Sequence, residues 1–155
     1  MQKPDSLRQA LLNAVPALRS HPDTLRLYVA SGNIAATLAP SLSFEKQYSL
    51  NVAITDFNDD IDLLLVPVMA WLRENQPGIM STDEGRSKGF TFYADINAGR
   101  SVNITLNLLL TERTLVKENE AGLYAENLPE PLPAEPVARP MMLYINGELV
   151  SQWTE

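Results

Sequence analysis

The chain contains no cysteine and a single histidine, His21, among its 155 residues. The lack of cysteine excludes disulfides, iron–sulfur clusters and thiolate zinc sites, and one histidine cannot build a multi-histidine metal site. The nucleophile motif GxSxG is absent, and "GRSKG" around Lys88 lacks the spacing of a phosphate-binding loop. His21 precedes a proline at the end of a predicted helix, where a surface or capping residue is expected. We therefore expect a protein that is not an enzyme and needs no cofactor or metal.

The chain also lacks long hydrophobic runs and clusters of basic residues. Its longest nearly apolar stretch, residues 63–72, is about half as long as a membrane span, and the start has no apolar signal region. The formal net charge is −7, and most of it falls in residues 117–155, where Lys117 and Arg139 face seven glutamates. An acidic chain gains nothing from counterion release on DNA or RNA. The sequence predicts a soluble, unexported protein that binds neither membranes nor nucleic acids.

The acidic stretch "TDFNDDID" resembles the opening of a calcium-binding loop, because Asp56, Asn58, Asp60 and Asp62 occupy every second position. Such a loop needs glycine at its sixth position and a glutamate at its twelfth. Counted from Asp56, those positions hold isoleucine and proline. We therefore expect a turn in which Asp60 or Asp62 caps the following helix.

Two segments have the apolar spacing of amphipathic helices. The first covers residues 5–20, where Asp5 or Ser6 is expected to cap its start and Pro16 to kink or divide it. The second ends near residue 76, and Pro67 either kinks it or opens it. A loop, "STDEGRSKG", is expected next. The apolar stripes are Leu7, Ala10, Leu11, Ala14, Val15 and Leu18 in the first helix and Ile61, Leu64, Leu65, Val68, Met69 and Leu72 in the second.

Alternating apolar and polar residues predict strands over residues 25–29, 44–54, 90–96 and 102–110, with a further extended run after residue 33. The short link "NAGR" predicts that the last two of these strands pair as antiparallel neighbours, and another hairpin is expected around residues 120–122. In "FTFYADIN" the inward side chains should be Phe90, Phe92, Ala94 and Ile96. The order of elements predicts an α+β domain over residues 1–127, with a largely antiparallel sheet and two main helices packed on one face.

The C-terminal part is organised differently. Residues 128–140, "LPEPLPAEPVARP", hold five of the eleven prolines with acids between them. This composition favours a polyproline II spacer that spans on the order of 40 Å. Residues 141–155 should form a β-hairpin, because Asn146-Gly147 is a strong two-residue turn signal that pairs Ile145 with Glu148. That pairing puts Met142, Tyr144, Leu149 and Trp153 on one face and Met141, Leu143, Ile145 and Val150 on the other.

Both faces of this hairpin are apolar. A two-stranded hairpin is marginally stable in water, so it should dock on its own sheet or on a neighbouring chain. Trp153 either packs onto the domain or anchors an interface. We take Met142, Tyr144, Leu149 and Trp153 as candidate interface residues.

Several longer strings resemble one protein family. The strings "SLSFEKQYSLNVAITDF", "LLLVPVMAWLRENQP", "KGFTFYADIN", "LLTERTLVKE" and "YINGELVSQW" together resemble the tail completion protein R family of contractile-tailed temperate bacteriophages and their prophages. The similarity runs over nearly the whole chain. It brings no set of functional residues that can be carried over by position.

The resemblance implies a late structural protein that completes the phage tail and makes it competent to join the filled head. Its expected partners are tail tube or sheath proteins and head–tail connector proteins, met in the host cytoplasm during assembly and in the virion tail. By analogy with tail terminators it would form a homo-oligomeric ring, in which each hairpin packs against the next subunit. The alternative is an assembly chaperone or generic protein-binding module that is not retained in the virion.

Overall fold

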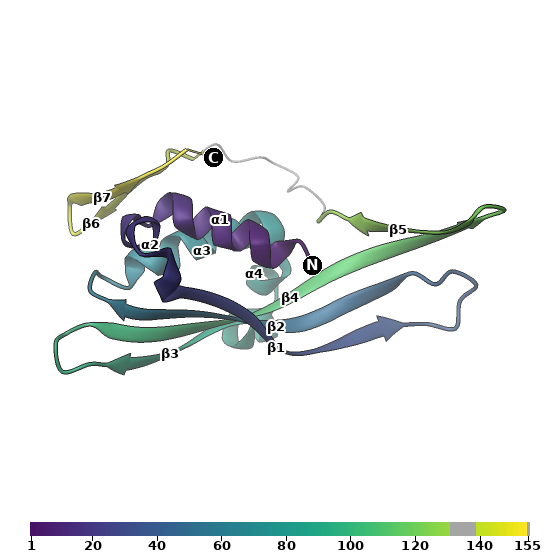
Figure 1. The fold of residues 1–155 in the computed structure, drawn as a ribbon, viewed down its shortest axis with the longest axis horizontal. Coiled ribbons are helices and arrows are strands. Elements are labelled where there is room, and N and C mark those ends of the chain that lie inside the picture. The colour runs from purple at the N-terminus through teal and green to yellow at the C-terminus, as the bar shows by residue number, and fades with distance from the viewer. Residues whose placement is uncertain (131–138, 155) are drawn as a thin grey trace.

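The computed structural model describes residues 1–130 and 139–154, and its elements form three layers. An antiparallel sheet carries the helices on one face, and the C-terminal hairpin lies on the far side of those helices (Figure 1). This confirms the predicted α+β class. Most of the predicted proline-rich spacer, residues 131–138, lies outside the described residues. The elements are α1 (Lys3–Ala14), α2 (Pro16–Ser20), η1 (Pro22–Thr24), β1 (Leu25–Ala36), β2 (Phe44–Phe57), α3 (Asp62–Asn75), α4 (Gly78–Ser81), η2 (Gly85–Gly89), β3 (Phe90–Ile96), β4 (Val102–Asn119), β5 (Gly122–Leu128), β6 (Met142–Ile145) and β7 (Glu148–Gln152).

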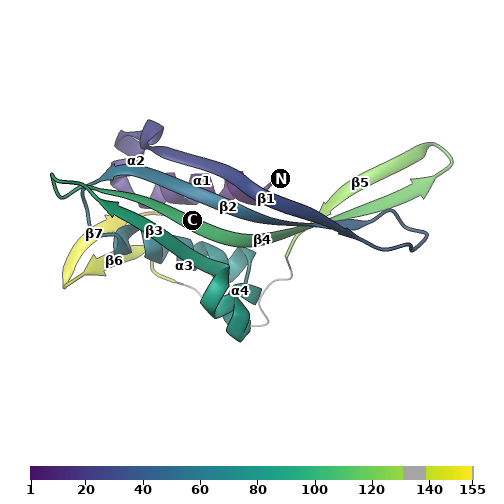
Figure 2. The same ribbon diagram turned by 90° about the horizontal axis from the view of Figure 1, so that it is seen from below.

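The main sheet is organised around the long strand β4. The strand order is β1-β2-β4-β3. Strands β3 and β5 lie on the same side of β4, where β3 pairs with its first part and β5 with its last part. Every pairing in the main sheet is antiparallel, in agreement with the largely antiparallel sheet predicted from the order of elements. Beyond the helices the sheet continues as two projecting hairpins, β1–β2 and β4–β5, which extend to one end of the molecule (Figures 1 and 2).

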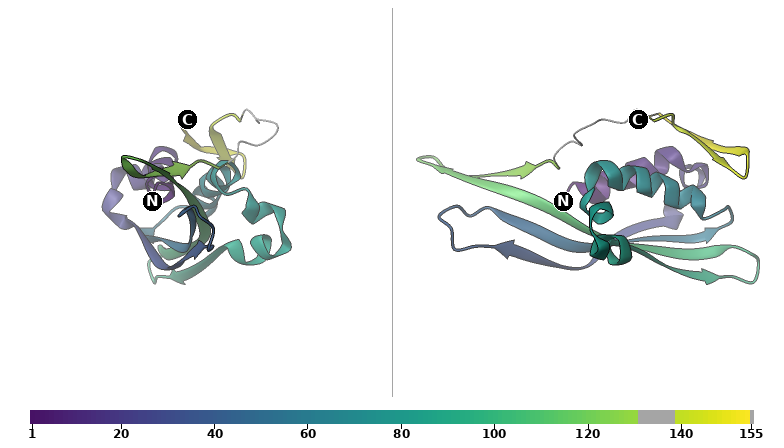
Figure 3. Two further views of the ribbon diagram at one scale, coloured as in Figure 1. Left: turned by 90° about the vertical axis from the view of Figure 1, so that its right-hand side faces the viewer. Right: turned by 180° about the vertical axis from the view of Figure 1, so that it is seen from behind.

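The core lies between the helices and the sheet, which curls around them when viewed along the long axis (Figure 3). Pro16 divides the first helix as predicted, since α1 ends at Ala14 and α2 begins at Pro16. Helix α3 runs through Pro67, which is buried. Each large aliphatic side chain buried here contributes about 1.5–3 kcal/mol. The largest fully buried side chains are Leu7, Leu11, Val15, Leu18, Leu50, Ile54, Leu64, Leu72, Ile104, Leu106, Leu108 and Leu110.

Two predictions about helix boundaries were wrong. Helix α1 begins at Lys3, so neither Asp5 nor Ser6 caps it, and the hydroxyl of Ser6 instead accepts a hydrogen bond of 3.0 Å from Trp71 Nε1. The segment predicted as a loop contains the helical turns α4 and η2. The buried side chain of Ile79 in α4 packs this segment onto the core. The prediction of a loop rested on the polar residues of the segment and did not take this apolar contact into account.

The strand predictions gave the positions of the strands but were partly wrong in extent and in burial. Residues 25–36 form one strand, β1, with a bulge between Val29 and Ser31 rather than two separate extended runs. Phe92 and Ile96 pair with Leu106 and Val102 and so point to the helix-covered side of the sheet. Both are nevertheless exposed, because β3 lies at the edge of the sheet, beyond the core that the helices cover.

Candidate functional site

The C-terminal hairpin packs on the helices and forms a separate two-stranded sheet. Among the described residues, strands β6 and β7 pair only with each other, and β6 contacts α3 (Figure 3, right). The sequence predicted docking on the main sheet or on a neighbour, so the docking on helices is a correction. On the outer face of the hairpin, Met142, Tyr144 and Leu149 are 44%, 57% and 51% exposed. On its inner face the apolar residues packed against the core are Leu143, Ile145, Val150 and Trp153.

The predicted grouping of Trp153 with Met142, Tyr144 and Leu149 was wrong. Ile145 pairs with Glu148 as expected, but the register shifts between Tyr144 and Leu143, whose partner is Ser151. One extra residue in β7 therefore reverses the side on which each later residue points. Trp153 turns to the inner face, where it is half-buried. It anchors the hairpin to its own helices.

The bulge also brings Ser151 to the end of α1. Pro16 stops the helix, so the carbonyl of Ala14 is left without an intrahelical partner. The buried hydroxyl of Ser151 donates a hydrogen bond to that carbonyl. Within the hairpin, the N–H of Trp153 donates to the carbonyl of Met141 at 2.9 Å. The proline break thus supplies the polar contact that fixes the hairpin.

Trp153 separates two open hollows beneath the hairpin. One, of about 390 Å³, is lined mainly by apolar groups that include Val66, Met69 and Met142. The other, of about 370 Å³, lies between α1 and α3 and includes Ser6 and Trp71. Among the described residues that line them, no nucleophilic side chain forms a hydrogen bond with a base. The mainly apolar lining of the first hollow suits packing against a side chain of another protein, whereas half of the residues that line the second are polar.

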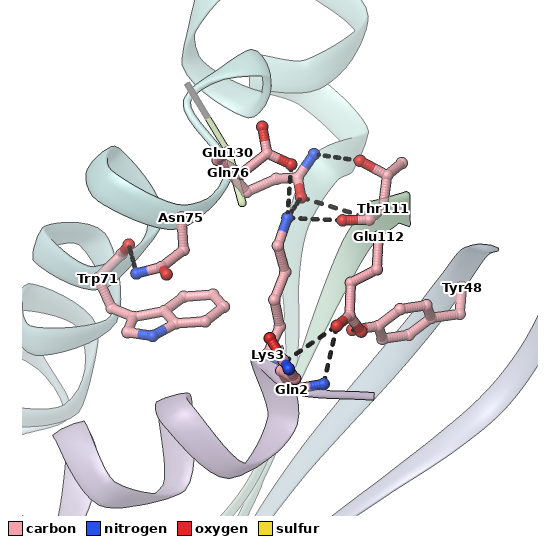
Figure 4. A network of polar contacts seen from close by, with 9 residues as sticks. All are labelled: Gln2, Lys3, Tyr48, Trp71, Asn75, Gln76, Thr111, Glu112 and Glu130. Carbon is pink, nitrogen blue, oxygen red and sulfur yellow. Dashed lines mark hydrogen bonds and ion pairs between the residues drawn. The ribbon is translucent and has the colours of Figure 1, made fainter. Parts of the chain in front are cut away.

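A buried polar cluster joins the N-terminus to the sheet (Figure 4). The Glu112 carboxylate accepts hydrogen bonds from the N–H of Gln2 at 2.8 Å and from the Tyr48 hydroxyl at 2.6 Å. Burial opposes ionisation of Glu112, but these bonds and one from the N–H of Lys3 outweigh it and lower the pKa of the carboxyl. Burial, the hydrogen bond to Glu112 and the charge of Glu112 raise the pKa of the Tyr48 phenol. The cluster is a satisfied structural network.

The same cluster fills a gap in the strand pairing of β4. Between the partners of β3 and β5, no strand in the described part of the chain pairs with Thr111 on that side. Its N–H donates to Gln76 Oε1 at 3.1 Å, and its carbonyl accepts from Lys3 Nζ at 2.6 Å. Lys3 also bonds Gln76 Oε1 at 2.7 Å and Glu130 at 2.8 Å. The side chains of Lys3 and Gln76 therefore replace a neighbouring strand, and Lys3 also holds Glu130, at the start of the proposed spacer, beside β4.

The acidic turn forms the corner between β2 and α3. Asp60 Oδ1 accepts the N–H of Asp62, the first residue of α3, at 2.9 Å, but the N-cap position itself is held by Ile61, which makes no side-chain cap bond. Asp56 adopts a positive φ of 53°, and its N–H donates to Asn103 Oδ1 at 2.9 Å. Among the residues that the structure describes, no group of three or more metal-ligating side chains comes together.

His21 is exposed at the end of α2 and shares an open hollow of about 440 Å³ with Asp56 and Asp59. Within the described ranges no ion pair joins His21 to a carboxylate. Its carbonyl accepts a hydrogen bond of 2.7 Å from Thr24 Oγ1, and its exposed position matches the surface residue expected from the sequence, while neither helix end has a side-chain cap bond here. This arrangement provides neither the orientation nor the shielding from water that a general base needs.

Sequence reasoning missed Lys3 and Glu112. The inward alternation of β4 through Ile104, Leu106, Leu108 and Leu110 continues to position 112. An acid at the next inward position signals a buried, partnered carboxylate. Lys3 gives no comparable signal, because its contacts lie 73 to 127 residues away in the chain.

Comparisons with known proteins point to phage tails. The family model described as P2 phage tail completion protein R (GpR) matches residues 1–131. Tail completion protein R of Escherichia phage P2 is 64% identical over 155 residues, which is all of both chains. No solved structure matches.

Proposed function

The chain belongs to the P2 phage tail completion protein R family and acts in phage tail completion and assembly, and from this premise we propose how it does so. It makes the tail competent to join the filled head through protein contacts at the head-proximal end. Its partners are tail tube or sheath proteins and head–tail connector proteins, and copies of the chain form a ring. It meets them in the host cytoplasm and stays in the virion tail.

The observation that carries this proposal is the outer face of the hairpin. Met142, Tyr144 and Leu149 stay exposed although the inner face is docked. Three exposed large apolar side chains on a two-stranded element are suited to burial against another protein. Trp153 supports this surface from below by holding the hairpin on α1 and α3. It thus contributes to the site without touching the partner.

Complementation of a phage that lacks this gene tests the proposal. The double variant Tyr144→Ser, Leu149→Ser should yield filled heads and separate tails that fail to join, counted by electron microscopy. The matched control is Leu123→Ser in β5, which removes one exposed apolar side chain at a distance from the hairpin and should join normally. Normal joining by the double variant would refute the role of this surface.

The alternative function is an assembly chaperone that leaves the finished tail. Mass spectrometry of purified virions separates the two, because a tail component remains at a fixed ratio to the other tail proteins. Absence from virions whose tails have joined would favour the chaperone.

A further inference from the structure

Exposed apolar side chains in the main sheet gather on strands with a free edge. Of the large hydrophobic residues of the main sheet that are exposed, all but Leu109 lie on β1, β3 or β5. Within residues 1–130 and 139–154, each of these strands is paired on one side only. Phe92, Tyr93 and Ile96 of β3 are 61%, 67% and 83% exposed. The others are Tyr28, Val29 and Ile34 on β1 and Leu123, Tyr124 and Leu128 on β5.

The edge strand β3 has few of the features by which monomeric proteins prevent a sheet edge from pairing with another chain. Such edges are usually blunted by lysine, proline, bulges or a covering loop. Strand β3 reads "FTFYADI", with one charged residue, Asp95, and pairs with β4 without a bulge. In β1 the bulge lies beyond residue 29, so residues 25–29 form a regular edge as well. Both segments can accept another strand.

These two edges are level with each other along the strands. The register runs across the sheet from Arg26 to Ala53, to Thr105 and to Tyr93. Strands β1 and β3 run in opposite directions, because three antiparallel pairings separate them. A copy rotated about an axis along the strands therefore brings its β1 beside β3 of the first copy, antiparallel and at the same height.

We propose that copies of this chain associate head to tail, with β1 of one copy pairing antiparallel to β3 of the next in the register that sets Arg26 opposite Tyr93. In this register Asp95 is the diagonal neighbour of Arg26, within reach of a long side chain. Each edge is already arranged for the contact: Arg26 lies 4.9 Å from the ring centre of Tyr28, and the Tyr93 hydroxyl donates to Asp95 at 3.3 Å. The contact adds an ion pair and a cation–π contact to the main-chain hydrogen bonds.

Head-to-tail pairing covers more apolar surface than a symmetric alternative. If β3 paired with β3 of a second copy, Tyr28 and Val29 would stay exposed on β1. Only the contact between unlike edges covers both strands, and repeated rotation of such a contact closes a ring. The inference rests on the ring of the proposed function and names the surfaces that form it. It does not involve the outer face of the hairpin.

Cysteine cross-linking tests this pairing directly, because the natural chain has no cysteine. Tyr28→Cys and Thr91→Cys, which the proposed register also sets opposite each other, are made separately in the full chain and leave Arg26, Tyr93 and Asp95 in place. Both side chains are exposed, so each variant should melt like the parent. Directly opposite residues have Cβ atoms about 4.5–5.5 Å apart, a distance that a short bismaleimide spans. The reagent is added to each variant alone, to their mixture, and to tails assembled in cells from the same variants.

The expected result is covalent dimers in the mixture and none in either variant alone. A chain carrying both cysteines should give a ladder of higher multiples. Leu109→Cys, exposed on the same face but in a central strand, is the matched control and should not cross-link with Thr91→Cys.

Two results would overturn the inference. Cross-linking of one variant with itself would show a symmetric contact, and no cross-link in solution or in tails would exclude pairing of these edges. Neither result touches the proposed role of the hairpin, since the joining assay with Tyr144→Ser, Leu149→Ser reports on a different surface. Failure of that assay would in turn leave the cross-linking result standing.

Discussion

Asp60 shows how a single acidic residue can be explained without a metal. Its carboxylate accepts the N–H of Asp62 at the start of α3. Replacing Asp60 by alanine should lower the free energy of unfolding by about 1 kcal/mol, because an exposed helix start loses its side-chain acceptor. Urea denaturation measures this change, and Asp59→Ala is the control because it removes a neighbouring carboxylate. Calcium should leave the melting temperature of the parent unchanged; a large rise would restore the metal interpretation.

Glu112 should make stability depend on pH in the acid range. Its pKa is lowered in the folded protein, because hydrogen bonds to the carboxylate outweigh the opposing effect of burial. The resulting stabilisation is fully present above the unfolded pKa of about 4.3 and is lost as pH falls through the folded value. Urea midpoints at a series of pH values from neutral to strongly acidic should therefore fall less steeply in Glu112→Gln than in the parent.

The control for this pH experiment is Glu118→Gln on the exposed part of β4. It removes a carboxyl without disturbing the buried cluster, so its pH profile should follow the parent. If Glu112→Gln also follows the parent, then the Tyr48 and Gln2 bonds do not hold the charge of this carboxylate.

The sequence predicted the role of a residue where that role depends on neighbouring residues in the chain. It failed where the role depends on a partner that is distant in the sequence. The contact of Asp60 with the start of α3 could be predicted because helix starts have short-range chemistry. The buried site of Lys3 could not, because Gln76, Thr111 and Glu130 reach it only through the fold. Ser6 was misjudged for the same reason, since its partner is Trp71 on another helix.

At the scale of elements, the hairpin shows how tertiary contacts override a register read from sequence. Asn146-Gly147 correctly set the turn and the pairing of Ile145 with Glu148. The bulge that follows could not be predicted, because it brings Ser151 to a carbonyl exposed by the break at Pro16. In the edge strand β3, the alternation of residues correctly predicted the side of the sheet to which Phe92 points. Whether Phe92 is buried depends instead on how far the helices extend over that side.

Ser151→Ala should loosen the hairpin while leaving the core intact. The change leaves the carbonyl of Ala14 without a partner in a buried position, which costs about 1–3 kcal/mol. Hydrogen exchange of the backbone amides in β6 and β7 should accelerate, whereas exchange in β2 and β4 should stay slow. Gln152→Ala, an exposed neighbour in β7, is the control. Equal acceleration throughout the sheet would mean that the hairpin and the domain unfold as one unit.

For the whole molecule, the proposals divide the work between two surfaces. The free edges of β1 and β3 belong to residues 1–127, proposed as the core domain, and the outer face of the hairpin belongs to residues 141–155, with residues 128–140 proposed as the spacer between them. A protein that joins copies of itself with one surface and other tail proteins with a second can close a ring and still present a binding face on every subunit.

A chain stopped after Arg139 tests this division of labour. The shortened chain keeps the core between its sheet and helices, so it should still unfold cooperatively. Its melting temperature should be lower than that of the full chain, because Leu143 and Trp153 no longer cover α1 and α3. Native mass spectrometry should find the same self-association as in the full chain, because both edges remain, while co-sedimentation with unfinished tails should be lost. The control is full-length Tyr144→Ser, Leu149→Ser, which should keep the parent's melting temperature and self-association but lose the tails. If the shortened chain is a monomer where the full chain is an oligomer, the hairpin itself joins the subunits, and the contact lies on a neighbour rather than on the edges of the sheet.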